Sequence, residues 1–136
     1  MLEVGTGLGH KTALLSSLAA AVWSVDVVEE FVLTAAERLG ALDLTNVTLR
    51  VGDGGGGWPD EGRFDAILVS AAARTLPTAL ARQLAPAGRM VLPLCGAEGG
   101  QRLVRVERGD VNDLTTSELL PVQFTELESV IRGVAG

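Results

Sequence analysis

The amino-acid sequence predicts one α/β domain over residues 1–136, with a doubly wound, mostly parallel sheet and an antiparallel hairpin at the C-terminal edge. Short runs rich in Val, Ile and Leu alternate with segments of helical period, as in strands that are buried on both faces and joined by helices. After Cys95 two strand-like runs follow each other without a helix between them. A chain of 136 residues that is 47% hydrophobic is long enough for one core.

The expected elements follow in regular order. Strands are predicted at residues 1–4, 21–26, 47–51, 64–70 and 89–94, and helices at residues 11–20, 29–39 and 76–84. Residues 101–110 and 114–124 predict the hairpin, in which Pro121 suits an edge strand. Sheets of this Rossmann-like kind bind ligands beyond the carboxyl ends of their strands, so the residues just after each strand are the candidates for function.

The composition argues against several partners. A net charge of -6 and a total of 11 scattered Lys and Arg do not suit a nucleic-acid surface, which needs clustered positive charge. The sequence contains no run of about 18 apolar residues, the length that a membrane helix needs. Cys95 has no second cysteine to pair with, and we expect it to be a small core residue. The sequence therefore predicts a cytoplasmic monomer without a metal site.

A glycine-rich turn, EVGTGLG at residues 3–9, joins the first strand to the first helix. Glycine allows a strand to turn sharply into a helix while its backbone comes close to a ligand. A dinucleotide fingerprint has its third glycine one position later, where this chain has His10. The carboxylate of Glu3 would repel a pyrophosphate but favour a ligand with an amino group and a sulfonium. The N-terminus of the following helix can receive the carboxylate of such a ligand.

Two further acids follow the second and third predicted strands. Asp26 lies where doubly wound folds place an acid for ribose hydroxyls. Asp53 can accept a hydrogen bond from an adenine amine, beside a backbone donor at Gly54. Together with Glu3 these acids predict an adenosyl pocket. Two alternatives stay open: Asp26 caps the next helix, or Asp53 is only a turn residue.

The stretch GDGGGGW at residues 52–58 predicts a flexible rim, because four successive glycines offer no side chains for packing. Trp58 is expected to pack against this loop, and a part in covering adenine stays open. His10, the only histidine, is expected at the surface or behind the ligand contacts rather than as a catalytic group.

Longer motifs resemble a known family. LEVGTGLGH (residues 2–10), FDAILVSAAA (64–73) and QLAPAGRMVLPL (83–94) are similar to LEIGTGSGY, FDAIxVxAAA and QLKPGGRLVLPV of the protein-L-isoaspartate O-methyltransferases. These are class I, S-adenosylmethionine-dependent enzymes. The resemblance implies methyl transfer from S-adenosylmethionine to the carboxyl of L-isoaspartyl residues in damaged proteins, a repair reaction. We expect the cofactor contacts at Glu3, Gly5, Thr6, Gly7, Gly9, His10, Asp26, Val27, Asp53 and Gly54, and assign no catalytic residue.

The chain also departs from the family. His10 and Lys11 stand where Tyr-Gln is common, and Ala87 replaces a glycine. The family carries a segment before the first strand, with a serine near the methyl-transfer site. We therefore expect a fragment or a shortened homologue that binds the cofactor weakly and methylates isoaspartyl peptides negligibly.

Other functions remain as alternatives. One is a non-catalytic S-adenosylmethionine-binding module, and another is a different small class I methyltransferase. A nicotinamide-dependent oxidoreductase is disfavoured by Glu3 and by the missing third glycine. The fourth strand ends in Ser70 and three alanines, without a polar clamp for an amine. Such a site suits an acceptor that is already anionic, since a carboxylate at pH 7 needs alignment and little proton removal.

Overall fold

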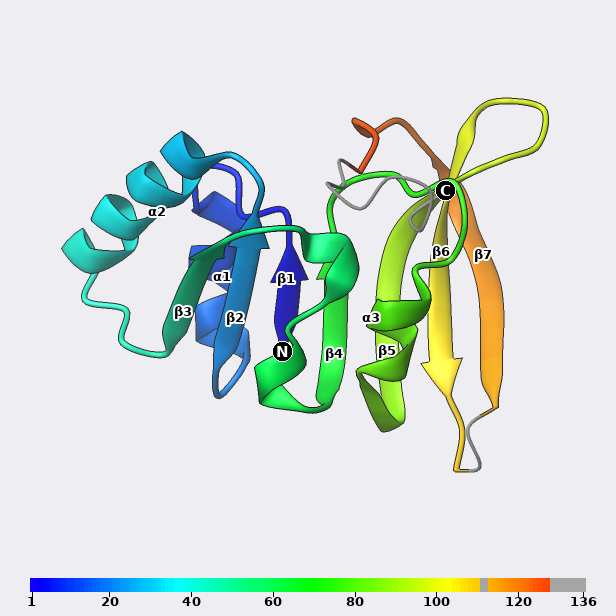
Figure 1. Ribbon diagram of the computed structural model, residues 1–136, viewed down its shortest axis with the longest axis horizontal. Coiled ribbons are helices and arrows are strands. Elements are labelled where there is room, and N and C mark those ends of the chain that lie inside the picture. Colours follow the sequence, from blue (N-terminus) through cyan, green and yellow to red (C-terminus); the bar gives the residue numbers. More distant parts are fainter. Residues whose placement is uncertain (111–112, 128–136) are drawn as a thin grey trace.

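The computed structural model describes residues 1–110 and 113–127 and is built from one mixed sheet and its helices (Figure 1). The strands are β1 (Leu2–Val4), β2 (Val22–Asp26), β3 (Val47–Val51), β4 (Phe64–Val69), β5 (Leu84–Cys95), β6 (Gln101–Arg108) and β7 (Leu114–Val122). The helices are α1 (His10–Leu18), α2 (Glu29–Ala41) and α3 (Thr78–Arg82), with 3₁₀ turns η1 (Gly54–Gly56) and η2 (Pro59–Glu61). The predicted α/β class is confirmed.

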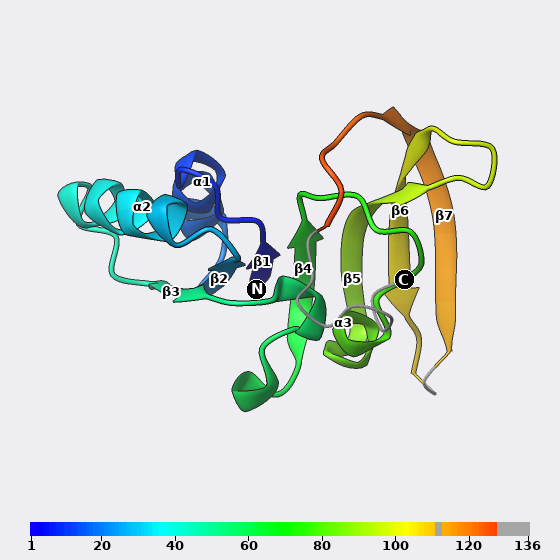
Figure 2. The ribbon, with the colours of Figure 1, turned by 45° about the horizontal axis from the view of Figure 1, so that its top comes forward.

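The sheet has the order β3-β2-β1-β4-β5-β6-β7. The first five strands are parallel, and β1 pairs with both β2 and β4. Helices α1 and α2 cover one face, whereas α3 covers the other (Figure 2). The chain therefore winds outward in one direction from β1 to β3 and in the opposite direction from β4 to β5. This reversal places a topological switch point between β1 and β4, where doubly wound sheets bind their ligands.

The antiparallel hairpin lies at the edge of the sheet, as predicted. Strand β6 pairs antiparallel with β5, and β7 pairs antiparallel with β6. Pro121 lies in β7 opposite Arg102, where an edge strand tolerates a residue without a backbone donor. Residues 111–112, part of the predicted connection, lie outside the described residues.

One predicted helix is much shorter than expected. The pattern predicted a helix over residues 76–84, but α3 ends at Arg82 and Leu84 already belongs to β5. Leu84 pairs with Phe64 and is fully buried, and the Phe64 N–H donates to the Gln83 carbonyl at 2.6 Å. Pairing with β4 therefore ends the helix before its apolar pattern does, and β5 is longer than the predicted strand at 89–94.

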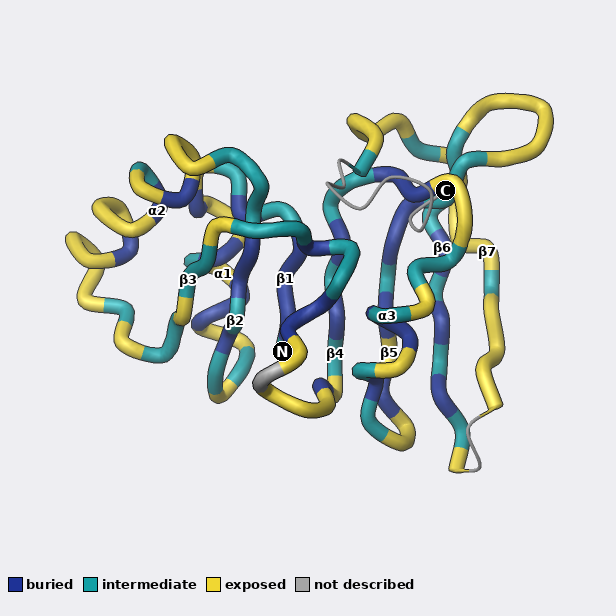
Figure 3. Tube along the Cα trace, viewed as in Figure 1, coloured by how far each residue is buried: buried dark blue, intermediate teal, exposed yellow. Residues whose placement is uncertain are grey.

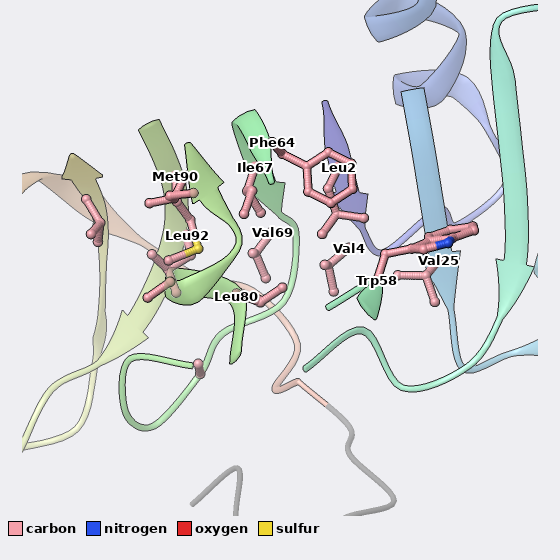
Figure 4. Packing of buried hydrophobic residues seen from close by; sticks show 14 of the residues in the cluster. Leu2, Val4, Val25, Trp58, Phe64, Ile67, Val69, Leu80, Met90 and Leu92 are labelled. Carbon is pink, nitrogen blue, oxygen red and sulfur yellow. The ribbon is translucent and has the colours of Figure 1, made fainter. Parts of the chain in front are cut away.

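The core lies along the middle of the sheet (Figure 3). Leu2 and Val4 alternate with Glu3 along β1, so the two apolar side chains share one face of the sheet. On that face they join a cluster that includes Ile67, Val69, Leu80, Met90 and Leu92 (Figure 4). This packing fixes β1 between its neighbours and holds the turn that follows it.

The glycine-rich loop is packed against the sheet and is not the flexible rim that its composition predicted. Gly54 is buried in η1, and a Cβ there would lie 2.3 Å from Val4 Cγ1. Trp58 is 6% exposed, beneath the Arg50 guanidinium at 4.2 Å from the ring centroid. Gln83 accepts from the Trp58 N–H and donates to its carbonyl, each at 2.6 Å. Glycine is required here by close approach rather than by flexibility.

Two expectations from composition concern the burial of Cys95 and the absence of a membrane helix. Cys95 is free and half-buried at the end of β5, so it lies less deep than a core residue would. No helix in the described part of the chain has the length and apolar character needed to cross a membrane.

Candidate functional site

A cavity of about 510 Å³ opens at the switch point, beyond the carboxyl ends of β1, β2 and β4. Its wall comes from the glycine turn, the end of β2, the two residues after β4 and the segment Thr125–Leu127. This volume lies within the range of about 300–1,000 Å³ that is usual for small-molecule sites. Both its place and its size therefore suit a bound cofactor.

The glycine turn adopts a backbone conformation that side chains rarely allow. Gly5, Gly7 and Gly9 have φ angles of 103°, 55° and 91°, all in the left-handed region. A Cβ on Gly5 would lie 3.3 Å from the Ser70 Cβ, and one on Gly9 would lie 3.0 Å from the Ala35 Cβ. The turn is thus wedged between the end of β4 and helix α2, and its glycines set both the path and the spacing.

Asp26 lines the cavity and fixes the glycine turn. One carboxylate oxygen accepts from the Gly7 N–H at 2.9 Å, and the other accepts from the Val28 N–H at 3.0 Å. A carboxylate offers about four acceptor positions, so these two bonds leave capacity for ligand hydroxyls. Val28, not Asp26, is the N-cap residue of α2, and α2 has no side-chain cap.

Glu3 lies beneath the turn rather than on the cavity wall. It is fully buried, and it pairs in register with Ser24 of β2 on the face covered by α1. Its Oε1 accepts from the hydroxyls of Ser24 at 2.6 Å and Thr12 at 2.5 Å, while its Oε2 has no hydrogen-bond partner among the described residues. Burial raises the pKa of Glu3, and the two hydroxyl bonds oppose this only in part. Thr6, on the cavity wall, bonds Ser24 at 2.6 Å and so connects this network to the site.

Asp53 and Gly54 lie at the end of β3. The Asp53 carboxylate accepts from the Gly55 N–H at 2.9 Å and caps η1, which is the turn role left open by the sequence. Gly54 lines the cavity, whereas Asp53 does not. The predicted contact between Asp53 and adenine stays a prediction.

Of the other residues expected at the site, some line the cavity and one does not. Val27 and His10 line the cavity, but Gly9 does not. His10 is exposed, with its Nε2 2.9 Å from the Arg38 guanidinium, which fits the expected surface position. No group of three metal-ligating side chains occurs among the residues that the structure describes.

Several residues that line the cavity were not predicted from the sequence. The segment Thr125–Leu127 crosses the end of β4, where the Ala72 N–H donates to the Thr125 carbonyl and the Leu127 N–H donates to the Ala72 carbonyl, both at 2.8 Å. More than 50 residues separate the two segments. Lys11 also reaches the site, and its ammonium donates to the Ser70 hydroxyl. Its place two residues after the last glycine of the turn was a signal that could have predicted this.

A family model described as protein-L-isoaspartate(D-aspartate) O-methyltransferase (PCMT) matches residues 1–131. The chain belongs to this family. Among curated PCMT relatives, protein-L-isoaspartate O-methyltransferase 1 of Polaromonas sp. is 41% identical over 133 residues, covering 98% of this chain and 56% of the relative. The protein-L-isoaspartate O-methyltransferase of Anaeromyxobacter dehalogenans (strain 2CP-1) is 52% identical over 128 residues, covering 93% and 61%. The chain thus spans less than two thirds of these PCMT relatives.

Solved structures agree with the PCMT assignment. A protein-L-isoaspartate O-methyltransferase matches with a TM-score of 0.87 and 25% identity, over 99% of this chain and 42% of its own. A Plasmodium falciparum structure described as a PCMT in complex with S-adenosyl-L-homocysteine matches with a TM-score of 0.76 and 24% identity, over 93% and 64%. At that identity the second match supports the fold alone.

Proposed function

We propose that this chain is the cofactor-binding part of a protein-L-isoaspartate O-methyltransferase. Such an enzyme transfers a methyl group from S-adenosylmethionine to the carboxyl of L-isoaspartyl residues in damaged proteins. The observation that carries the proposal is the cavity at the β1/β4 switch point, where the glycine turn and Asp26 meet in a chain of the PCMT family.

The residues of the cavity fit S-adenosylmethionine. Asp26 has acceptor capacity for the vicinal ribose hydroxyls and already holds the turn at Gly7. Gly54 lines the cavity, where its backbone can face a flat base. Lys11 offers a positive charge at the end of the cavity formed by Ser70. The cavity volume of about 510 Å³ suits a ligand of nucleoside size with an extended tail.

The bound cofactor supplies a methyl group on a sulfonium. What the protein contributes is alignment, because the acceptor carboxylate is already ionised at pH 7 and needs no general base. The two residues after β4 at the cavity are Ser70 and Ala71, which form neither a base nor a clamp for an amine. This arrangement suits an anionic acceptor in a protein or peptide that carries an L-isoaspartyl residue.

Titration calorimetry on the 136-residue chain tests the cofactor. S-adenosyl-L-homocysteine should bind, whereas NAD at the same concentrations should give no detectable binding. The reverse order would overturn the proposal, since a dinucleotide needs a different turn.

Transfer of labelled methyl groups tests the acceptor. When the chain is fused to the segment that precedes the first strand in a full-length relative, an isoaspartyl peptide should be labelled and the matched peptide with a normal aspartyl residue should not be. If that fusion binds S-adenosyl-L-homocysteine but labels neither peptide, the chain acts as a binding module and the catalytic half of the proposal fails.

A further inference from the structure

Lys11 is the only lysine of the chain and the only Lys or Arg on the described cavity wall. It is the second residue of α1, and its side chain is exposed on the side that faces the cavity. Its ammonium donates to the hydroxyl of Ser70, the residue that follows β4. The bond joins residues 59 positions apart and holds the positive charge over one end of the cavity.

The opposite end of the cavity is formed by Asp26 at the end of β2. Because β1 lies between β2 and β4, the two ends are separated by two strand spacings, about 10 Å. A ligand whose ribose hydroxyls meet Asp26 would extend its amino-acid tail across the glycine turn toward Lys11. The chain of single bonds between ribose and carboxylate in S-adenosylmethionine can cover a span of that order.

The charges around the cavity make this cation important for a ligand that carries a carboxylate. Asp26 and Glu126 both line the wall, and the whole chain has a net charge of -6. Glu126 pairs with Arg74 at 3.3 Å, and Arg74 is not part of the wall. Without Lys11 the described wall would carry two carboxylates and no lysine or arginine, a potential that repels an anionic group. An ammonium has three N–H donors, so the bond to Ser70 leaves two for a ligand.

We propose that the ammonium group of Lys11 pairs with the carboxylate at the amino-acid end of S-adenosylmethionine, so that the site selects this cofactor over its decarboxylated form. The inference rests on the proposed function, because it assumes an S-adenosyl ligand in the cavity. Ser70 acts as a positioning residue, since its hydroxyl holds the flexible lysine side chain over the cavity before the ligand arrives.

The test compares two ligands and three proteins by titration calorimetry, in the absence of any peptide. The ligands are S-adenosyl-L-homocysteine and its decarboxylated analogue, which keeps the amine and lacks the carboxylate. The proteins are the wild type, Lys11→Met and the control Arg63→Met. Arg63 is exposed and directly precedes β4, so it lies at the end of that strand opposite to Ser70. The control substitution therefore removes one positive charge, as Lys11→Met does, but away from the cavity.

Lys11→Met should bind S-adenosyl-L-homocysteine roughly tenfold more weakly, as expected for loss of a partly exposed charged contact. Its affinity for the decarboxylated analogue should stay within about twofold of the wild type, and Arg63→Met should leave both affinities unchanged. Thermal unfolding of Lys11→Met should match the wild type, because the Lys11 side chain is exposed.

Two results would overturn the inference while leaving the proposed function intact. In the first, Lys11→Met weakens both ligands by the same factor. In the second, it weakens neither ligand, and the lysine then serves another group such as the acceptor carboxylate. If the wild type binds neither ligand, the inference and the proposed function both fail.

Discussion

Glu3 and Asp26, two acids predicted at the ends of neighbouring strands, have different positions relative to the cavity. Glu3 and Asp26 were both expected to touch the ligand, but Glu3 is an interior residue of β1 and Asp26 is the last residue of β2. Because side chains alternate along a strand, Glu3 points to the α1 face, toward Ser24 and Thr12. Asp26 lies at the carboxyl end of β2, where it lines the cavity. Both side chains carry a carboxylate, so the position of each acid within its strand determines its role.

Replacing Asp26 tests its double role. Asp26→Ala should weaken S-adenosyl-L-homocysteine binding by about 1.5–3 kcal/mol, since a charge-assisted hydrogen-bond partner is lost. The fold should persist with a lowered melting temperature, because the Gly7 and Val28 N–H groups lose their acceptor. Calorimetry and thermal unfolding measure the two effects. Glu37→Ala, an exposed acid on α2, should change neither, and unchanged affinity in Asp26→Ala would restrict Asp26 to holding the turn.

The buried carboxyl of Glu3 should make stability depend on pH. Its pKa is raised above 4.5 in the folded state, so the folded protein holds this proton more tightly than the unfolded chain does. The contribution of Glu3 to the free energy of unfolding should therefore be greatest at low pH and fall as pH rises from 4.5 through the folded pKa. Glu3→Gln, which cannot ionise, should gain stability relative to the wild type over this interval.

Urea unfolding of both proteins between about pH 4.5 and about pH 8 measures that difference. The control Glu37→Gln, exposed on α2, should show a nearly constant difference from the wild type. A constant difference for Glu3→Gln would mean that Glu3 ionises equally readily in the folded and unfolded states.

At the scale of single elements, the start of β5 is the most irregular part of the sheet. Its pairing with β4 passes from Phe64↔Leu84 directly to Ala66↔Arg89, so residues 85–88 bulge out of the ladder. Within this bulge Ala87 has a φ of 64°, in the left-handed region where the family resemblance places a glycine. A residue that has a Cβ is strained at this φ angle, so alanine at position 87 destabilises the start of β5.

Restoring glycine should therefore stabilise the protein. Ala87→Gly should raise the free energy of unfolding by about 0.5–1 kcal/mol, the strain relieved less the added freedom of the unfolded chain. The urea midpoint measures this change. Ala36→Gly, at an exposed position inside α2, should lower stability by about 1 kcal/mol. If both variants lost stability, the strain at Ala87 would be absent.

At the scale of the whole molecule, the sheet has a protected middle and two exposed edges. Within residues 1–110 and 113–127, strands β1, β4 and β5 each pair on both sides, whereas β3 and β7 each pair on one side. Leu119 and Leu120 of β7 are 44% and 51% exposed, while Val106 of β6 is fully buried. The hairpin thus contributes to the core through β6, and β7 shields it.

Hydrogen exchange should follow this arrangement. Amides of β4 and β5 should exchange slowest, because their opening requires disruption of the core. Amides of β7 that point away from β6 should exchange much faster. Mass spectrometry after timed exchange checks the order. Equal protection on both sides of β7 would mean that another chain covers this edge, contrary to the expected monomer.

The sequence by itself determined the features that depend on neighbours along the chain. The apolar runs predicted the parallel strands, the glycine spacing predicted the turn, and the missing helix after Cys95 predicted the hairpin. Each signal follows from a period or a backbone requirement within a few residues, and such local preferences survive in the fold. Longer motifs carried the resemblance to the family, which the comparisons confirm.

Only the tertiary structure decided which distant residues meet. It placed Glu3 behind the site, set Lys11 against Ser70, laid the segment Thr125–Leu127 over the end of β4, and fixed β6 rather than β7 beside β5. It also ended α3 early and packed the glycine loop on Val4. These outcomes depend on strand register and on burial, which arise between segments far apart in sequence and leave no local period to read.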